Sequence, residues 1–239
     1  MSYIIVTGKL DSGKSTVVDI LAQKGFKTVK YTDILSRMFD RTSLQERICS
    51  IFGDKAVKNG RLDLKYIQLM LYYNNEINKQ ELEYCMSSFF FSDFSEETWA
   101  YTDEPIFVEV PYIQNIINKF KEKLVNIKAT IIVKATEENR KARAKKLTHE
   151  QLLEKDFVDF DIEGIELEND TSIATLSHRI EYILTNIEFT DSERNSVFLR
   201  FYKEHCQQEK EDIHCLAYRK FKNCSKCPFP CLSNKHRRK

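Results

Sequence analysis

Long apolar runs, glycine and proline are all scarce in this chain of 239 residues. No apolar stretch approaches the roughly 20 residues that a membrane-spanning helix needs, so none is expected. With only 6 Gly and 4 Pro, the composition excludes collagen-like and low-complexity classes. The formal net charge is +1, so the whole chain has no overall field that would attract nucleic acid. The remaining composition, 42% hydrophobic and 31% charged, is that of a globular protein with a substantial core.

The first residues, MSYIIVTGK, lack the basic segment and the continuous apolar core of a secretory signal. We therefore expect a soluble, cytoplasmic protein. Disulfides are rare in that compartment, so a cysteine-rich segment would point first to a metal site.

Short β-branched apolar runs alternate with helix-forming segments over the first three quarters of the chain. Strands are expected at residues 3–7, 28–31, 106–110, 129–135 and 165–167. Helices are expected over 15–23, 33–84 (with breaks near residues 52–53 and 59–60) and 173–187, whereas 87–96 is expected to be irregular. This alternation predicts an α/β fold, with a P-loop NTPase-like parallel sheet flanked by helices.

Residues Gly8 to Ser15 fit the phosphate-loop pattern G-x-x-x-x-G-K-[ST] directly after one expected strand and at the start of a helix. In such a loop, main-chain N–H groups surround phosphate oxygens at the N-terminus of a helix. Lys14 would neutralise charge on the β and γ phosphates, and the Ser15 hydroxyl would ligate Mg²⁺. The expected nucleotide-binding residues are Gly8, Lys9, Leu10, Asp11, Ser12, Gly13, Lys14, Ser15 and Thr16.

A phosphate loop occurs in kinases, switch GTPases and motor ATPases alike. The chain is short, and it lacks the Asn-Lys-x-Asp motif that reads guanine. It also has no obvious apolar run ending in the Asp of a Walker B motif. A small-molecule kinase with inserted lid and substrate segments fits this layout best.

Further segments follow the phosphate loop in a fixed order. Residues 52–53 with 60–63 are similar to an "FG…DGxLDR" stretch, and 108–111 to a "DVPLL" strand end. Residues 131–143 are similar to "VVVDAPxExQxxRL", and 169–171 to the turn "DNxGS". Together with residues 25–33, a second strand that ends in an Asp, they make residues 1–187 resemble the dephospho-coenzyme A kinases.

The resemblance implies ATP-dependent phosphorylation of the ribose 3′-hydroxyl of dephospho-coenzyme A, the final step of coenzyme A synthesis, with ATP and Mg²⁺. Asp33 would hold and deprotonate the acceptor hydroxyl, with a helix N-cap as its alternative role. Arg143 matches the family's lid arginine and would clamp the ATP phosphates with help from Arg140. Arg61 and Pro111 are expected at the substrate, with a place in a surface loop as the alternative for Arg61.

The chain departs from the family pattern at several points. Residues 9–11 fill the phosphate loop where the family usually has Gly-Ile-Gly, and Cys85-Met86 stands where a His-Pro pair usually opens a helix. Glu109 replaces the common Asp, and it is a candidate to hold a Mg²⁺-bound water. These differences concern the fit of the substrate more than the type of reaction.

The expected domain organisation follows from these segments. Residues 1–190 would form a P-loop kinase domain, with a helical substrate-binding insertion at 34–104 and a lid at 136–160. Residues 191–239 would form a Cys-rich basic extension outside the family resemblance.

Four thiols in the extension have spacing suited to a metal. They are Cys215, Cys224, Cys227 and Cys231. A tetrahedral Zn²⁺ site is favoured over an iron–sulfur cluster, and free thiols in a disordered tail are the alternative. Such a short tail could not bury much core, so the metal would supply its folding energy.

The sequence is also compatible with two other functions. One is a nucleoside or nucleotide kinase of the same fold. The other is a non-catalytic nucleotide-binding module whose basic tail, with eight Lys/Arg and no acid in residues 219–239, binds nucleic acid or an acidic partner. Oligomeric state does not follow from the sequence.

Overall fold

The computed structural model describes residues 1–73, 76–100, 104–111, 114–144, 162–194, 196–197 and 200. The chain divides into two compact units. Residues 1–28 and 101–239 form one, here called the core unit, and residues 29–100 form the other, here called the helical unit. In the described part of the chain, no helix combines the length and the apolar character that crossing a bilayer requires.

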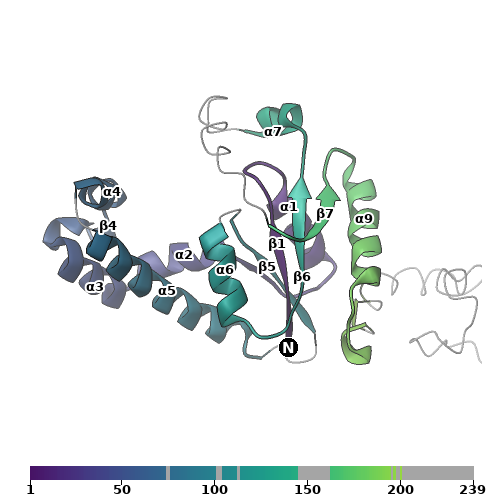
Figure 1. The fold of residues 1–239 in the computed structure, drawn as a ribbon, viewed down its shortest axis with the longest axis horizontal. Coiled ribbons are helices and arrows are strands. Elements are labelled where there is room, and N and C mark those ends of the chain that lie inside the picture. Colours follow the sequence, from purple (N-terminus) through teal and green to yellow (C-terminus); the bar gives the residue numbers. More distant parts are fainter. Residues whose placement is uncertain are drawn as a thin grey trace, which may run out of the picture. The chain divides into compact units, whose positions relative to one another are not determined.

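The core unit is built on a parallel sheet (Figure 1). Its strands are β1 (Ser2–Thr7), β5 (Pro105–Glu109), β6 (Ile127–Lys134) and β7 (Ile165–Glu168). The strand order of the whole sheet is β2-β5-β1-β6-β7, and the chain passes into the helical unit within β2 (Thr28–Lys30). β1 is central, and Val6 pairs with Glu109 on one side and with Ile131 on the other. The expected parallel α/β sheet is thus confirmed.

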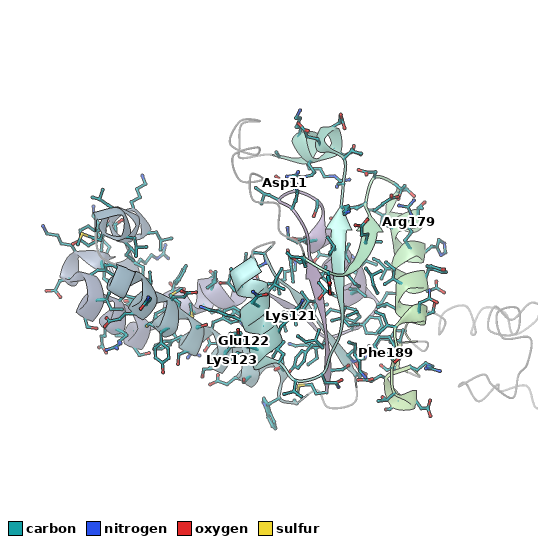
Figure 2. The ribbon with its side chains drawn as sticks, viewed as in Figure 1. Asp11, Lys121, Glu122, Lys123, Arg179 and Phe189 are labelled. Atoms are coloured by element: carbon teal, nitrogen blue, oxygen red, sulfur yellow. The ribbon has the colours of Figure 1, made fainter. Side chains whose placement is uncertain are left out.

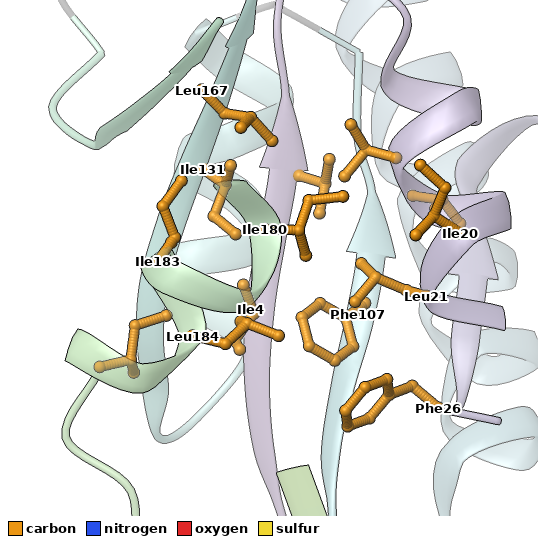
Figure 3. Packing of buried hydrophobic residues seen from close by; sticks show 14 of the residues in the cluster. Ile4, Ile20, Leu21, Phe26, Phe107, Ile131, Leu167, Ile180, Ile183 and Leu184 are labelled. Carbon is orange, nitrogen blue, oxygen red and sulfur yellow. The ribbon is translucent and has the colours of Figure 1, made fainter. Parts of the chain in front are cut away.

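In the described part of the core unit, this sheet is accompanied by the helices α1 (Lys14–Gln23), α6 (Gln114–Lys123), α7 (Glu137–Arg143) and α9 (Ile173–Asn186). Helices α1 and α9 pack against one face of the sheet (Figure 3). Ile4 of β1 and Phe107 of β5 are fully buried there against Leu21 and Ile180. Burying each such side chain contributes about 1.5–3 kcal/mol, so this layer fixes where the strand ends lie.

The described segment after α9 stays on this core. Ile187, Phe189 (labelled in Figure 2) and Val197 belong to the same apolar cluster as α1 and α9. The Arg200 guanidinium donates to the Gly25 carbonyl oxygen and to Glu104, and it lies 5.2 Å from the centre of the Phe26 ring. Val197 and Arg200 therefore both contact the core unit.

A capping box opens the segment that precedes Arg200. The Thr190 N–H donates to the Glu193 carboxylate at 2.9 Å, and the Glu193 N–H donates to the Thr190 hydroxyl at 3.3 Å. Burial raises the pKa of Glu193, but hydrogen bonds, two of them from Thr190, outweigh it and leave the pKa below its usual value. The carboxylate is thus held ionised where it caps the turn.

The helical unit contains α2 (Tyr31–Phe39), α3 (Thr42–Phe52), a 3₁₀ turn (Asp54–Ala56), α4 (Leu64–Tyr73) and α5 (Glu76–Thr98). A two-residue hairpin joins β3 (Val57–Lys58) to β4 (Arg61–Leu62). Its turn residues Asn59 and Gly60 have φ of 54° and 72°, the positive values that a tight primed turn demands. Asp63 then accepts a 3.0 Å bond from the N–H of Tyr66 and begins α4.

Packing between α2, α3 and α5 forms a separate apolar core. Ile34, Met38, Leu44, Ile48 and Phe94 are each at most 1% exposed. Ion pairs join α2 and the residues just after it to α5. Arg37 pairs with Glu97, and Arg41 pairs with Asp93 at 2.6 Å and with Glu96 at 3.8 Å.

The expectation that residues 87–96 are irregular is wrong. These residues lie inside α5, which continues to Thr98. Phe90 and Phe94 are one helical turn apart and buried, with their rings stacked at 6.3 Å, and Tyr31 lies against Phe90 at 4.7 Å. Packing of this aromatic face supplies the stability that the weak helix propensities of Phe and Ser do not.

Candidate functional site

The phosphate loop connects β1 to α1 at the carboxyl edge of the sheet, where α/β folds place their ligands. Figure 2 shows Asp11 in this loop, close to α7. Gly8 has φ of 150°, and a Cβ there would lie 2.2 Å from the carbonyl oxygen of Val133 on β6. A side chain at this position would therefore push the loop away from the sheet.

Lys14 lies at the start of α1, and its ammonium group reaches back over the loop. Nζ donates to the carbonyl oxygens of Gly8 at 2.9 Å and Lys9 at 3.0 Å. Burial lowers the pKa of Lys14, while the charges of Glu109 and Asp11 oppose that shift. The expected phosphate-binding cation is thus already positioned against the loop that would hold the phosphates.

Ser15 and Glu109 meet at the ends of α1 and β5. Ser15 Oγ donates to Glu109 Oε1 at 2.8 Å, and Glu109 Oε2 is buried without a hydrogen-bond partner in the part of the chain that is described. Hydroxyl and carboxylate oxygens are the ligands that Mg²⁺ prefers. A buried, incompletely satisfied carboxylate beside the loop serine fits a site for the Mg²⁺ that accompanies a nucleotide. Glu109 is the last residue of the apolar strand β5, and a Walker B Asp is expected at the end of such a strand.

Arg140 and Arg143 both reach the phosphate loop, but they contact its main chain. Arg140 is 4% exposed, and its Nε donates to the Leu10 carbonyl oxygen at 2.8 Å. Arg143 donates to the carbonyl oxygens of Ser12 at 3.2 Å and Asn169 at 2.6 Å.

Asn169 is a site residue that the sequence analysis did not single out. It is 5% exposed, and its Nδ2 donates to the Ser12 carbonyl oxygen at 2.9 Å. Gly13 permits this approach, since a Cβ there would lie 1.9 Å from the same Nδ2. Only the turn pattern at residues 169–171 marked this position, because the partner lies 157 positions earlier in the chain.

The next residue, Asp170, fixes the start of α7. Its carboxylate accepts bonds from the Thr136 N–H at 2.9 Å and the Asn139 Nδ2 at 2.7 Å. Thr136 caps the helix, with its hydroxyl accepting from the Asn139 N–H at 3.4 Å. Burial raises the pKa of Asp170, but the hydrogen bonds from Asn139 and Thr136 outweigh it and lower the pKa overall.

The remaining expected site residues are distributed over both units. Asp33 is an exposed residue in the first turn of α2, and Arg61 is an exposed residue of β4, both in the helical unit. Pro111 follows β5 in the core unit. The alternative role of Asp33 as an N-cap is wrong, because α2 begins two residues earlier and its N-cap is Lys30.

The expected metal ligands Cys215, Cys224, Cys227 and Cys231 lie outside the described residues, as does most of the lid expected at 136–160. Within the described residues, no cluster of three or more His, Cys, Asp or Glu side chains is placed to hold a metal. A metal in the extension is therefore still a prediction.

Solved structures share the fold. The crystal structure of TT1252 from Thermus thermophilus superposes with a TM-score of 0.63 at 23% identity, covering 79% of this chain and 98% of that one. A dephospho-CoA kinase from Campylobacter jejuni superposes with a TM-score of 0.50 at 19% identity, covering 77% of this chain and 95% of that one.

Sequence comparison reaches the same family. A dephospho-CoA kinase of Fusobacterium nucleatum is 29% identical over 195 residues, which is 76% of this chain and 97% of the relative. The family model for dephospho-CoA kinase matches residues 2–159. With the phosphate loop, Lys14 and the Ser15–Glu109 pair at the edge of a parallel sheet, this match shows that the chain belongs to the dephospho-CoA kinase family.

Proposed function

We propose that this chain transfers the γ-phosphoryl group of ATP to the ribose 3′-hydroxyl of dephospho-CoA. The observation that carries the proposal is the arrangement of Lys14, Ser15 and Glu109 around a phosphate loop in a chain of this family. Phosphoryl transfer needs positioning and charge neutralisation more than covalent chemistry, and these residues supply both.

The phosphate loop would hold the β and γ phosphates of ATP. On nucleotide binding, Lys14 exchanges its bonds to the Gly8 and Lys9 carbonyl oxygens for phosphate oxygens. Ser15 and Glu109 would hold Mg²⁺, directly or through water, and the ion neutralises charge on the phosphates when bound. Arg143 keeps N–H groups beyond the two bonds described, and these could contact the transferring group.

Asp33 would act as the base for the acceptor hydroxyl. Its carboxylate is exposed in the first turn of α2, so a substrate can reach it. Arg61 and Pro111 would contribute to the acceptor site, as the family resemblance implies. The helical unit that carries Asp33 and Arg61 would therefore supply most of the acceptor specificity.

The test is release of ADP from ATP-Mg²⁺ in a coupled assay, with dephospho-CoA as acceptor and nucleosides and nucleoside monophosphates as alternatives. Asp33→Asn is compared with Asp40→Asn, which changes an exposed aspartate at the opposite end of the same helix. We expect turnover with dephospho-CoA alone, lost at least about 100-fold in Asp33→Asn and kept in Asp40→Asn. Turnover with a nucleoside or nucleotide in place of dephospho-CoA would contradict the proposal.

A metal bound by the C-terminal extension is a separate proposal. The spacing of Cys215, Cys224, Cys227 and Cys231 fits Zn²⁺ better than an iron–sulfur cluster. Metal analysis of the full chain should find one zinc ion per chain, lost on replacing Cys224 and Cys227 with Ser. Metal-free protein with freely titrating thiols would contradict it.

A further inference from the structure

Two carbonyl oxygens of the phosphate loop are held from outside the loop by side chains of distant segments. Leu10 O accepts from Arg140 Nε at 2.8 Å, and Ser12 O accepts from Asn169 Nδ2 at 2.9 Å. Arg143 adds a second, longer bond to Ser12 O at 3.2 Å. Arg140 and Asn169 are buried at 4% and 5% exposure, so these bonds are sheltered from competing water.

Holding a carbonyl also orients the next N–H group. In a planar trans peptide, the C=O of one residue and the N–H of the next point in opposite directions. Fixing Leu10 O therefore directs the Asp11 N–H away from Arg140, and fixing Ser12 O directs the Gly13 N–H away from Asn169. The Ser12 N–H is already bonded to Lys9 O at 3.2 Å. The hydrogen bonds from Arg140 and Asn169 therefore decide the direction of two other loop donors, the N–H groups of Asp11 and Gly13.

The loop needs such support because its backbone is unusual. Asp11 has φ of 57°, a left-handed conformation that costs a non-glycine residue about 1 kcal/mol or more. Gly13 has φ of 94° and lies against Asn169 with no room for a Cβ. A strained backbone conformation persists only when surrounding groups hold it in place, and hydrogen bonds from outside the loop do so here.

The supporting side chains are themselves tied together. Arg143 donates to the carbonyl oxygen of Asn169 at 2.6 Å, and the Asn169 N–H donates to Lys134 O at 2.7 Å. The neighbouring Asp170 accepts from Thr136 and Asn139 at the start of α7. The end of β6, the first turns of α7 and the turn after β7 thus form one connected support behind the loop.

We propose that Arg140 and Asn169 are positioning residues of this kinase, which act through the Leu10 and Ser12 carbonyl groups to pre-orient the Asp11 and Gly13 N–H groups for phosphate. Their contribution is to the geometry of the loop, and Arg140 acts by its hydrogen bond, not by the charge that it brings near ATP. This inference rests on the proposed function, because it assumes that the loop binds the phosphates of a nucleotide.

The decisive test uses three variants of Arg140 that separate hydrogen bond from charge. In Arg140→Gln, the amide nitrogen lies the same number of bonds from the main chain as Nε, so the donor to Leu10 O is kept and the charge is lost. Arg140→Lys keeps the charge but places a methylene group there. Arg140→Met lacks both. Affinities for MgADP and for inorganic pyrophosphate are measured by calorimetry on the full chain, together with thermal unfolding.

We expect Arg140→Gln to bind both probes within about threefold of wild type, and Arg140→Lys and Arg140→Met to bind about tenfold more weakly. If Arg140→Lys matches wild type while Arg140→Gln is weakened, Arg140 acts by charge and the proposal is wrong. Equal losses in Arg140→Gln and Arg140→Met would also overturn it, since the retained donor would then have no effect.

Asn169 is tested by Asn169→Ala against Asn186→Ala. Asn186 makes the same kind of bond, from Nδ2 to the Tyr182 carbonyl oxygen at 2.8 Å, but on α9. We expect about tenfold weaker MgADP binding and a raised KM for ATP only in Asn169→Ala, with KM for dephospho-CoA unchanged. A shift of the Gly13 amide resonance in Asn169→Ala without ligand would report the loosened peptide directly. Unchanged MgADP affinity in Asn169→Ala would overturn the role of Asn169.

The binding measurements need no acceptor, so the two proposals can fail separately. Wild-type protein that binds MgADP but turns over no dephospho-CoA would contradict the proposed function and leave the positioning roles standing. Wild-type protein that binds neither MgADP nor pyrophosphate would contradict both. Should Asn169→Ala fail to fold, the Arg140 series still decides the role of the outside hydrogen bonds.

Discussion

The phosphate loop and the helical unit are held in shape by different kinds of contact. At the loop, side chains from distant segments donate to main-chain oxygens, as Arg140 and Asn169 do to Leu10 and Ser12. In the helical unit, apolar side chains such as Phe94 pack between helices, and arginines pair with carboxylates of α5. Directional bonds to the main chain tolerate little change, whereas packing accepts many side chains of similar volume. We therefore expect substitutions to act differently in the two regions.

If the contrast is correct, variants at the loop should reduce activity with little loss of stability, and variants in the helical unit should do the reverse. The largest effect is expected for Lys14→Met. Losing the cation that would face the β and γ phosphates should lower kcat/KM for ATP at least about 100-fold. The coupled ADP assay measures this, with Lys121→Met on the exposed face of α6 as the matched control. Activity within threefold of wild type in Lys14→Met would remove Lys14 from the site.

Phe94→Ala should produce the largest loss of stability in the helical unit. Phe94 is 1% exposed, and removing a buried phenylalanine costs about 3–5 kcal/mol of unfolding free energy. Phe89→Ala, at a half-buried position of the same helix, should cost about 1 kcal/mol. Denaturant unfolding gives both values. The MgADP affinity of folded Phe94→Ala should stay near that of wild type. A tenfold loss of affinity would contradict the expectation that variants in the helical unit affect stability and not nucleotide binding.

A smaller difference in stability should separate the ion pair of Arg41 with Asp93 from that of Arg37 with Glu97. Arg41 pairs with Asp93, whose side chain is 5% exposed, whereas Arg37 pairs with Glu97, whose side chain is 25% exposed. Arg41→Met leaves a buried carboxylate without its cation and should cost about 1–3 kcal/mol. Arg37→Met should cost at most about 1 kcal/mol. Chemical denaturation measures both unfolding free energies. If Arg41→Met and Arg37→Met lose the same amount, burial of Asp93 does not decide the strength of its ion pair.

The smallest effect is expected for Asp170→Asn, and it should depend on pH. The pKa of Asp170 is lowered in the folded state, so ionised Asp170 contributes stability above its unfolded pKa of about 3.9. That contribution is lost as the pH falls through the lowered folded pKa. The unfolding free energy of wild type should therefore exceed that of Asp170→Asn by less than about 1 kcal/mol at pH 7. This difference should vanish at strongly acidic pH. A difference that grows on acidification would have the wrong sign.

The elements built from local patterns were predictable from the sequence. The apolar run of β1, the phosphate-loop motif, the turn at Asn59-Gly60 and the Thr136 cap each depend on neighbouring residues. The helix over residues 87–96 was not predictable, because its stability comes from the packing of Phe90 and Phe94 within the helical unit.

The same limit applies to the site. The sequence alone determined that a lysine and a serine follow a glycine-rich loop, because that motif is local and its chemistry is carried by main-chain N–H groups and one cation. Only the tertiary structure decided that Glu109 would meet Ser15, and that Arg140 would bond to Leu10 O and Asn169 to Ser12 O. These partners are separated by 94, 130 and 157 positions, and the register of parallel strands, not any local pattern, brings them together.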